Sequence, residues 1–356
     1  MNLDIFQYEF TVNTVELNEE YFSKLKIMGI IKMNKNILPV LTIVVLLVAS
    51  CGGSGSGDDD DSITTPEVVN FASAPSSELI TSGPVEVITE DTVRYHVINL
   101  LDGNFTSTMI ETATGLIIVD VGPEFIENAG TELRTYADAI GKPMSIIMTH
   151  NHLDHWGNMA SFSDIPVYSH DDVAPLLMET TDFTDRYPDI VNSVSSSQEI
   201  EGLTFTFDTI QNAETGENGY VYIESLQAVF VADLVYNRAH NFIREYSPLD
   251  GTNEVDNWIE GLELLDTKFG TYSHIFCGHN GTRTDVTNVI DENILYLTIA
   301  QELISGLRPL SNGNTASTVQ EIIDELLVIY PDHVMSGLMF SLPGVFAPDD
   351  PGADWF

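Results

Sequence analysis

Basic residues are scarce in this 356-residue sequence. It contains 13 Lys and Arg against 54 Asp and Glu, which gives a formal net charge of −41. A surface so acidic repels phosphate backbones and anionic lipid headgroups. The composition therefore excludes nucleic-acid binding through a basic face, and it leaves metal ions, small molecules and locally screened anions as partners. We interpret the acidity as a solvated surface rather than as a calcium buffer.

Cysteine is scarce as well. The two cysteines, Cys51 and Cys277, exclude a disulfide scaffold. Hydrophobic residues make up 43% of the chain, which excludes an intrinsically disordered protein. No internal repeat and no second Gly/Ser-rich linker divides the C-terminal part, so we expect one folded domain over residues 84–356, with helices at its end.

The N-terminal 50 residues resemble a bacterial export signal. Residues 38–49 are almost all apolar, and Lys32 and Lys35 precede them. The sequence Val48-Ala49-Ser50-Cys51 resembles the lipobox of bacterial lipoproteins, which implies that Cys51 receives a lipid. We therefore expect an exported lipoprotein, periplasmic or at the cell surface, that is anchored in the membrane only through this lipid. An ordinary signal peptide that leaves Cys51 as a free thiol is the alternative.

Two further N-terminal segments have distinct compositions. Residues 1–27 carry several glutamates, which is untypical of a signal peptide, so we interpret them as an extension of the gene model. Residues 51–83 begin with a Gly/Ser-rich and Asp-rich run that is typical of a flexible tether.

Strand-like and helix-like segments follow in two similar series. The predicted strands, bounded by turn residues, are 93–100, 107–111, 115–119, 144–148, 203–210, 220–224, 228–231 and 274–277. The predicted helices are 125–140, one that begins near Trp156, 255–268, 286–305 and one that is entered through a capping box at residues 317–320. Two halves of this kind imply two sheets face to face with helices outside. Residues 171–197 form either a lid or a helix and an ordinary surface loop.

The most informative segment directly follows the apolar run 144–148. It reads Thr-His-Asn-His-Leu-Asp-His-Trp-Gly-Asn and places four metal-binding side chains within six residues: His150, His152, Asp154 and His155. In an extended segment alternate side chains point the same way, so the first two imidazoles can hold one metal. The other two side chains project from the following turn toward a second metal. Clustered histidine and carboxylate predict a metal centre at the rim of a sheet.

The pattern His-x-His-x-Asp-His after a strand resembles the signature of the metallo-β-lactamase superfamily, and the resemblance extends over nearly all of residues 84–310. It implies an α/β fold, a four-layer αββα sandwich of two mixed β-sheets flanked by helices. It also implies roles for three residues that follow apolar runs. Asp233 would bridge two metals, His279 would complete the shell of the second metal, and Asp120 would support the ligand loop from behind.

The third ligand of the first metal departs from the common pattern. The superfamily usually has a histidine between the cluster and the bridging residue, but residues 212–220 contain none. Glu214 is the expected substitute, and a carboxylate there resembles the alkyl-sulfatase-like branch. Glu217 is the alternative carboxylate, and a degenerate or one-metal site is the other alternative.

The resemblance implies two divalent cations per chain. Zinc is the expected metal, and iron or manganese is the alternative because Glu214 adds a hard oxygen donor. His150, His152 and Glu214 would hold the first metal, Asp154, His155 and His279 the second, and Asp233 both. We expect a metal-dependent hydrolase in which a bridging hydroxide cleaves an ester, lactone, amide or sulfate-ester bond of a small molecule, with Asp154 and Asp233 as catalytic carboxylates. A noncatalytic metal- or ligand-binding lipoprotein and an iron-dependent oxidoreductase of the same fold are the alternatives.

Three residues shortly after Asp233 are candidate substrate contacts. Tyr236, Arg238 and His240 stand where loops at strand ends line pockets. Arg238 would clamp an anionic group with two hydrogen bonds, unless it only forms a surface ion pair. His240 would be a substrate contact or a proton donor, or simply a hydrogen-bonded structural histidine.

Overall fold

The computed structural model describes residues 68–179, 191–243, 246–247, 252–335, 341–342 and 345. The chain divides into two units, Met1–Ser62 and Ile63–Phe356, and the described residues all belong to the second. Cys51 and the predicted export signal lie outside them. Among the described residues, no helix combines the length and the apolar character needed to cross a membrane.

The first of two mixed sheets has seven strands in chain order. They are β1 (Val85–Thr89), β2 (Arg94–Leu100), β3 (Phe105–Glu111), β4 (Leu116–Val119), β5 (Met144–Ile147), β6 (Val167–His170) and β7 (Val191–Val194). Strands β1 to β4 pair antiparallel, and β4 to β7 pair parallel. Because the carboxyl ends of parallel strands meet at one edge, the loops after β4, β5 and β6 are brought together there.

The second sheet has six strands in the order β15-β14-β11-β10-β9-β8. They are β8 (Ser197–Ile200), β9 (Leu203–Gln211), β10 (Glu217–Ile223), β11 (Ala228–Tyr236), β14 (His274–His279) and β15 (Thr282–Arg283). Only β11 and β14 pair parallel within it. A separate hairpin joins β12 (Tyr246–Ser247) to β13 (Thr252–Asn253).

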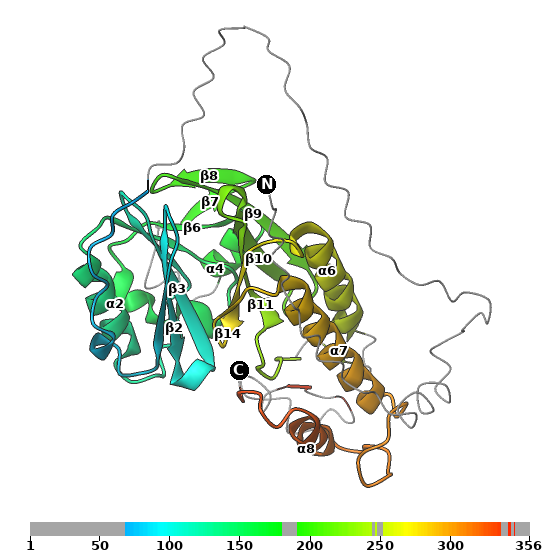
Figure 1. Ribbon diagram of the computed structural model, residues 1–356. Coiled ribbons are helices and arrows are strands. Elements are labelled where there is room, and N and C mark those ends of the chain that lie inside the picture. The colour runs from blue at the N-terminus through cyan, green and yellow to red at the C-terminus, as the bar shows by residue number, and fades with distance from the viewer. Residues whose placement is uncertain are drawn as a thin grey trace, which may run out of the picture. The chain divides into compact units, whose positions relative to one another are not determined.

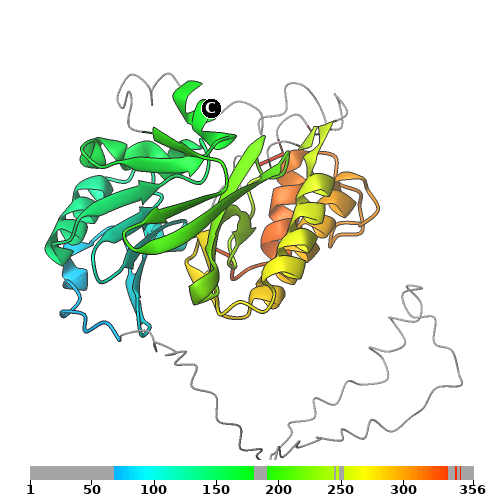
Figure 2. The same cartoon turned by 90° about the horizontal axis from the view of Figure 1, so that it is seen from above.

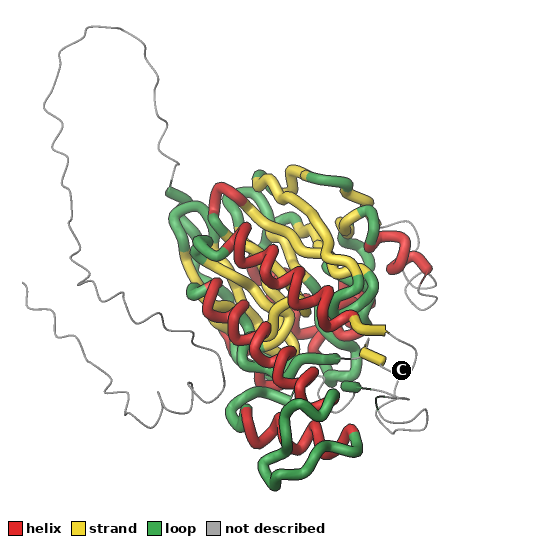
Figure 3. Tube along the Cα trace, turned by 90° about the vertical axis from the view of Figure 1, so that its right-hand side faces the viewer, coloured by secondary structure: helices red, strands yellow, loops and turns green. Residues whose placement is uncertain are grey.

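Helices cover the outer faces of both sheets. Helix α2 (Ala129–Ile140) lies on the first sheet, and α6 (Glu254–Phe269) and α7 (Val286–Ile304) lie on the second, so they stand at opposite sides in Figures 1 and 2. Figure 3 shows α6 and α7 side by side across the strands. Shorter helical segments are η1 (Ser77–Leu79), η2 (Leu101–Gly103), α3 (Leu153–Trp156), η3 (Gly157–Phe162), α4 (Val173–Glu179), η4 (Glu224–Leu226) and α8 (Val319–Ile329).

Three apolar clusters fill the spaces between these layers. Alternation along β2 sends Tyr95 and Val97 toward the second sheet and Ile98 and Leu100 toward α2. Between the sheets the rings of Phe230 and Phe276 stack 4.5 Å apart. A third cluster joins the outer face of the second sheet to α6, α7 and α8. The layers confirm the predicted αββα sandwich.

Some boundaries differ from the sequence prediction. The helix expected from Phe125 begins at Ala129, directly after Asn128 with its φ of 66°. Strands β1, β6, β7, β8, β12, β13 and β15 were not predicted, because they have two to five residues and lack the continuous apolar run that marks the equally short β4. Within the predicted tether, residues 77–79 are helical and Ile80 is 5% exposed, so packing against the domain begins before residue 84. The predicted lid segment holds α4 and β7, and its residues 180–190 lie outside the described part.

Candidate metal centre

Two groups of four ligand side chains meet where the two sheets end. The first group is His150, His152, Glu214 and Asp233, and the second is Asp154, His155, Asp233 and His279. Within each group the ligand atoms all lie within 4.8 Å of one another, and Asp233 belongs to both. All seven predicted ligands are therefore brought together. Glu217 is in neither group, and its Oε1 accepts a hydrogen bond from Gln211 at 3.0 Å.

The first group surrounds the carboxylate of Glu214, which is carried by the turn between β9 and β10. His152 Nδ1 lies 3.1 Å from Glu214 Oε1, and His150 Nε2 lies 3.8 Å from Glu214 Oε2. His150 Nε2 is also 4.0 Å from Asp233 Oδ2. These separations fit donor atoms that share one metal ion of about 2 Å bond length.

The second group surrounds the carboxylate of Asp233 on the other side. Asp233 Oδ1 lies 3.1 Å from His155 Nε2, and Asp233 Oδ2 lies 2.9 Å from His279 Nε2. Asp154 Oδ2 is 3.6 Å from His155 Nε2 and 3.9 Å from His279 Nε2. The two oxygens of Asp233 thus serve both groups, as expected for a residue between two metals.

Hydrogen bonds at the far nitrogen orient three of the imidazoles. Asp120 Oδ2 accepts from His155 Nδ1 at 2.8 Å and from Thr149 Oγ1 at 2.7 Å. Because the Thr149 hydroxyl gives its proton to Asp120, it accepts from His150 Nδ1 at 3.1 Å. His279 Nδ1 donates to the backbone oxygen of Asn104. Each Nε2 therefore presents its lone pair to the centre, which is the arrangement found around metal-binding histidines.

The donor atoms at the centre are buried and lack hydrogen-bond partners. His150 Nε2, His155 Nε2, Asp233 Oδ1 and both carboxylate oxygens of Glu214 are such atoms. Burying polar atoms without partners is costly, and an ion bound by all of them removes that cost. Nitrogen and oxygen donors of this kind suit zinc. The residues present therefore fit two divalent cations.

The charges within the centre shift one another's pKa. Although burial favours the neutral acid, the charges of His279 and His155 hold the pKa of Asp233 well below its usual range. Burial would lower the pKa of His152, but the negative charge of Glu214 raises it to about 9. Burial and the neighbouring imidazoles lower the pKa of His150. Protons on some imidazoles thus balance the carboxylates, and a metal that binds must displace them.

The backbone is unusual at three points that position the centre. Asp120, directly after β4, has a φ of 54°, and Ala232, directly before Asp233, has a φ of 45°. Such values are rare for residues with a Cβ and are typical of functional sites. A Cβ at Gly278 would lie 2.1 Å from Asp233 Oδ1, so only glycine allows this close approach.

The three candidate substrate contacts lie in different places. Tyr236 is 2% exposed, its hydroxyl donates to Asp233 Oδ2 at 3.1 Å, and its ring stacks on His279 at 4.6 Å. His240 is in neither ligand group, and its Nδ1 lies 3.0 Å from the Tyr296 hydroxyl. Arg238 is exposed and lines a pocket that contains none of the seven ligands. Of the three, the structure brings only Tyr236 to the metal centre.

Two supporting groups were missed by sequence reasoning. Thr149 directly precedes His150, but a threonine at the end of a strand gives no signal that its hydroxyl links two site residues. Asn104 acts through its backbone oxygen and lies 175 residues from His279 in the sequence. No local pattern could have revealed that contact.

Comparison with known proteins agrees with this architecture. Residues 102–279, half of the chain, match the Metallo-beta-lactamase superfamily. The chain is similar to a metallo-beta-lactamase from Pontibacter korlensis, with 18% identity and a TM-score of 0.45 over 60% of this chain and 99% of that one. It is also similar to the inverting sec-alkylsulfatase Pisa1 from Pseudomonas sp., with 14% identity and a TM-score of 0.47 over 67% of this chain and 44% of that one. No sequence among the curated proteins matches. By its sequence match over half its length, the chain belongs to the metallo-β-lactamase superfamily.

Proposed function

We propose that this chain is a dinuclear metallohydrolase that cleaves an ester, lactone, amide or sulfate-ester bond in a small molecule. The observation that carries the proposal is the pair of four-ligand groups that share Asp233. The superfamily includes hydrolases such as β-lactamases and alkylsulfatases, and its fold binds divalent metals, typically zinc. Zinc is therefore the metal that we propose for both positions.

The chain's own residues set up the reaction. Two divalent cations, when bound, lower the pKa of a water between them toward about 7 and polarise the bond to be cleaved. Asp233 lies between the two ligand groups, and Asp120 and Thr149 hold His155 and His150 in the orientation that ligation needs. Tyr236 donates a hydrogen bond to Asp233 and thereby restrains the shared carboxylate.

The exposed fractions of the ligand side chains indicate from which side a substrate reaches the centre. The side chains of His152 and Asp154 are 24% and 23% exposed, whereas those of His150, Glu214 and Asp233 are at most 2% exposed. A substrate therefore approaches over His152 and Asp154. Three carboxylates and two dications leave a net positive centre before hydroxide binds, so an anionic or strongly polarised group can dock there despite the acidic surface.

Metal analysis of the full chain tests the ligand set. We expect two equivalents of zinc after reconstitution in the unchanged protein and about one in Glu214→Gln. Glu217→Gln is the matched control, because it makes the same change three residues away at a carboxylate outside both groups. It should keep both metals. One equivalent or none in the unchanged protein would rule out the dinuclear centre and favour a noncatalytic binder.

An activity screen tests the reaction class. We expect turnover of at least one generic ester, lactone, amide or sulfate ester, its loss with a chelator and its return with zinc. A protein that binds two zinc ions but hydrolyses none of these compounds would contradict the proposed reaction. Iron in the purified protein, with oxygen-dependent chemistry, would favour the oxidoreductase alternative.

We also propose that Cys51 carries a lipid and anchors an exported protein. The support is the lipobox-like sequence at residues 48–51 and the acidic Gly/Ser tether after it. Cys51→Ala should move the protein from the membrane fraction to the soluble fraction, and mass spectrometry should find diacylglycerol on the unchanged cysteine. An unmodified Cys51 in membrane-free protein would contradict the anchor.

A further inference from the structure

Arg238 stands apart from the other cations of this acidic chain. The structure describes seven Lys and Arg residues, and six of them lie within 3.2 Å of a carboxylate oxygen: Arg94, Arg134, Lys142, Lys268, Arg283 and Arg308. Arg238 has no ion pair and no side-chain hydrogen bond to any described residue. In a chain with 54 acidic residues, such a free guanidinium is a binding group without a ligand.

The backbone holds Arg238 in place. Its φ is 48°, in the left-handed region that residues with a Cβ seldom adopt. Its carbonyl accepts a hydrogen bond from the Val334 amide at 3.0 Å. Strained conformations of this kind persist where surrounding contacts fix them, and they concentrate at ligand sites.

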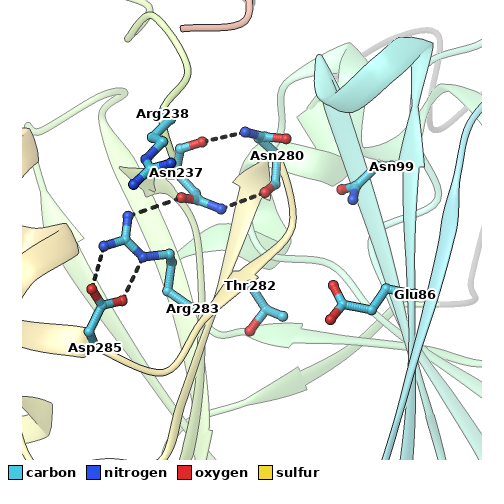
Figure 4. A pocket seen from close by; sticks show the side chains of 8 residues that line it. All are labelled: Glu86, Asn99, Asn237, Arg238, Asn280, Thr282, Arg283 and Asp285. Carbon is cyan, nitrogen blue, oxygen red and sulfur yellow. Dashed lines mark hydrogen bonds and ion pairs between the residues drawn. The ribbon is translucent and has the colours of Figure 1, made fainter. Parts of the chain in front are cut away.

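The side chain of Arg238 lines a polar pocket of about 420 Å³ (Figure 4). The other lining residues are Glu86, Asn99, Asn237, Asn280, Thr282, Arg283 and Asp285. They come from β1, β2, the end of β11 and the segment after β14. None of them is a ligand of the metal centre, although Asn280 directly follows the ligand His279.

One wall of the pocket is fixed by its own hydrogen bonds. Asn237 Nδ2 donates to the Asn280 carbonyl at 2.7 Å, and Asn280 Nδ2 donates to the Asn237 carbonyl at 2.8 Å. Arg283 forms two hydrogen bonds with Asp285 and one of 3.3 Å with Asn237 Oδ1. These bonds appear as dashed lines in Figure 4. A wall that is already ordered loses little freedom when a ligand binds.

Two charged residues that line the pocket, one of each sign, have no ion pair. Arg283 pairs with Asp285 and also with Glu292, which is not among the lining residues. The guanidinium of Arg238 and the carboxylate of Glu86 have no partner among the described residues. Figure 4 shows these two side chains on opposite sides of the pocket. A dianion would meet repulsion from Glu86, and a simple cation would meet repulsion from Arg238. A ligand with one charge of each sign satisfies both.

We propose that this pocket binds a small zwitterion, an amino acid or short peptide, with its carboxylate on Arg238 and its ammonium group on Glu86. A guanidinium binds a carboxylate with two parallel hydrogen bonds, which suits the first contact. Between the charges, Asn99 and Thr282 offer hydrogen bonds to a peptide group. A pocket of about 420 Å³ has room for a short peptide. The proposal does not depend on the hydrolase activity.

Calorimetric titration of the zinc-loaded full chain with triglycine tests the site. Triglycine should bind, and N-acetyl-triglycine and triglycine amide, which each lack one charge, should bind at least about tenfold more weakly. Arg238→Gln should remove the preference for the free carboxylate, and Glu86→Gln should remove the preference for the free ammonium group. Arg308→Gln, which changes an ion-paired arginine outside the pocket, is the matched control and should bind as the unchanged protein does.

Three outcomes would overturn the proposal. They are the absence of triglycine binding, binding that Arg238→Gln leaves undiminished, and equal binding of triglycine and its N-acetylated form. Zinc content, measured on the same samples, should be two equivalents in every variant. A failed dinuclear centre would therefore show in the zinc content, and a failed pocket would show in the titration.

Discussion

The two sheets contribute to the metal centre in different ways. The first sheet supplies four ligands from one short segment after β5, His150 to His155. The second sheet supplies three ligands from separate places: Glu214 from the turn between β9 and β10, Asp233 from within β11 and His279 from the end of β14. The ligands of the second set are 1% to 2% exposed, and so are His150 and His155 of the first set. Only the side chains of His152 and Asp154 are more exposed, at 24% and 23%. The contiguous motif thus forms the accessible side of the centre, and residues of both sheets form its floor.

The difference in depth predicts a difference in sensitivity. A ligand at the exposed side can be replaced by water, but a ligand in the floor leaves neighbouring donors buried and unpaired when it is lost. Substitutions of the buried ligands should therefore affect the centre more than matched substitutions of His152 and Asp154.

The largest effect is expected for Asp233→Asn. This change weakens the carboxylate that both groups share, so bound zinc should fall from two equivalents to less than one. The rate of hydrolysis should fall by much more than the roughly 100-fold that is lost when a hydrogen-bond partner behind a metal ligand is removed. Asp154→Asn makes the same change at the exposed side and should still retain one equivalent. Metal analysis and initial rates give both results, and two tightly bound zinc ions in Asp233→Asn would contradict the shared role.

A smaller effect is expected for Asp120→Asn. Asp120 accepts from His155 and Thr149 but lies behind the ligands, so its loss should weaken zinc binding about 10- to 100-fold without removing a donor atom. Competition with a chromogenic chelator measures the affinity. Thr149→Val removes only the hydroxyl and should cost less than Asp120→Asn. Equal zinc affinity in Asp120→Asn and the unchanged protein would show that the hydrogen bonds do not orient the ligands.

The contiguous segment explains why so much of the centre could be predicted from sequence. Four ligand side chains within six residues after an apolar run point to a metal site by local geometry alone. Asp233 and His279 carry no such local signal, and they became candidates only through the resemblance to a family. Glu214 was the expected third ligand and Glu217 the alternative, and this preference too came from the resemblance to a family. The turn between β9 and β10, which aims Glu214 inward and leaves Glu217 beside Gln211, separates them.

The fold shows the same division between local and long-range information. Strands β2, β4, β5 and β9 and the long helices α6 and α7 were predicted close to their observed bounds, whereas β11 continues to Tyr236, five residues beyond its predicted end. Short edge strands such as β7 and β8 depend on pairing with neighbours, which a single segment does not encode. That Arg238 forms no ion pair with a described residue could not be predicted either, because ion pairing depends on which acidic side chains the fold brings near.

A moderate effect is expected for Tyr236→Phe. The change removes the hydrogen bond to Asp233 Oδ2 but keeps the ring that stacks on His279. One hydrogen bond of this kind contributes about 1 kcal/mol, so kcat should fall about fivefold while KM changes little. Tyr236→Leu also removes the stacked ring and should weaken zinc binding. If kcat were unchanged in Tyr236→Phe, the hydroxyl would have no role in restraining the shared carboxylate.

The smallest effect concerns a buried histidine behind each sheet. His96 contacts the Tyr136 hydroxyl on α2 at 2.9 Å, and His240 contacts the Tyr296 hydroxyl on α7 at 3.0 Å. Burial lowers the pKa of both to about 4, below the 6.5 of the unfolded chain. Between pH 4 and pH 6.5 the unfolded chain therefore binds more protons than the folded one. The contribution of the two neutral histidines to the free energy of unfolding is complete above pH 6.5 and is lost as the pH falls toward 4.

Between pH 6.5 and pH 4, the free energy of unfolding should fall less in His240→Asn than in the unchanged protein, by on the order of 1 kcal/mol. His96→Asn should reduce this fall as well, but it also removes the contact of 3.3 Å with Glu111, so it should lower stability at every pH. Denaturant unfolding at several pH values measures both slopes. Because the centre of each variant keeps all its ligands, acid release of metal is common to all samples and cancels in the difference. If the free energy of unfolding depended on pH in His240→Asn as it does in the unchanged protein, His240 would take up its proton without destabilising the fold. The buried histidine behind the second sheet would then differ from His96 behind the first.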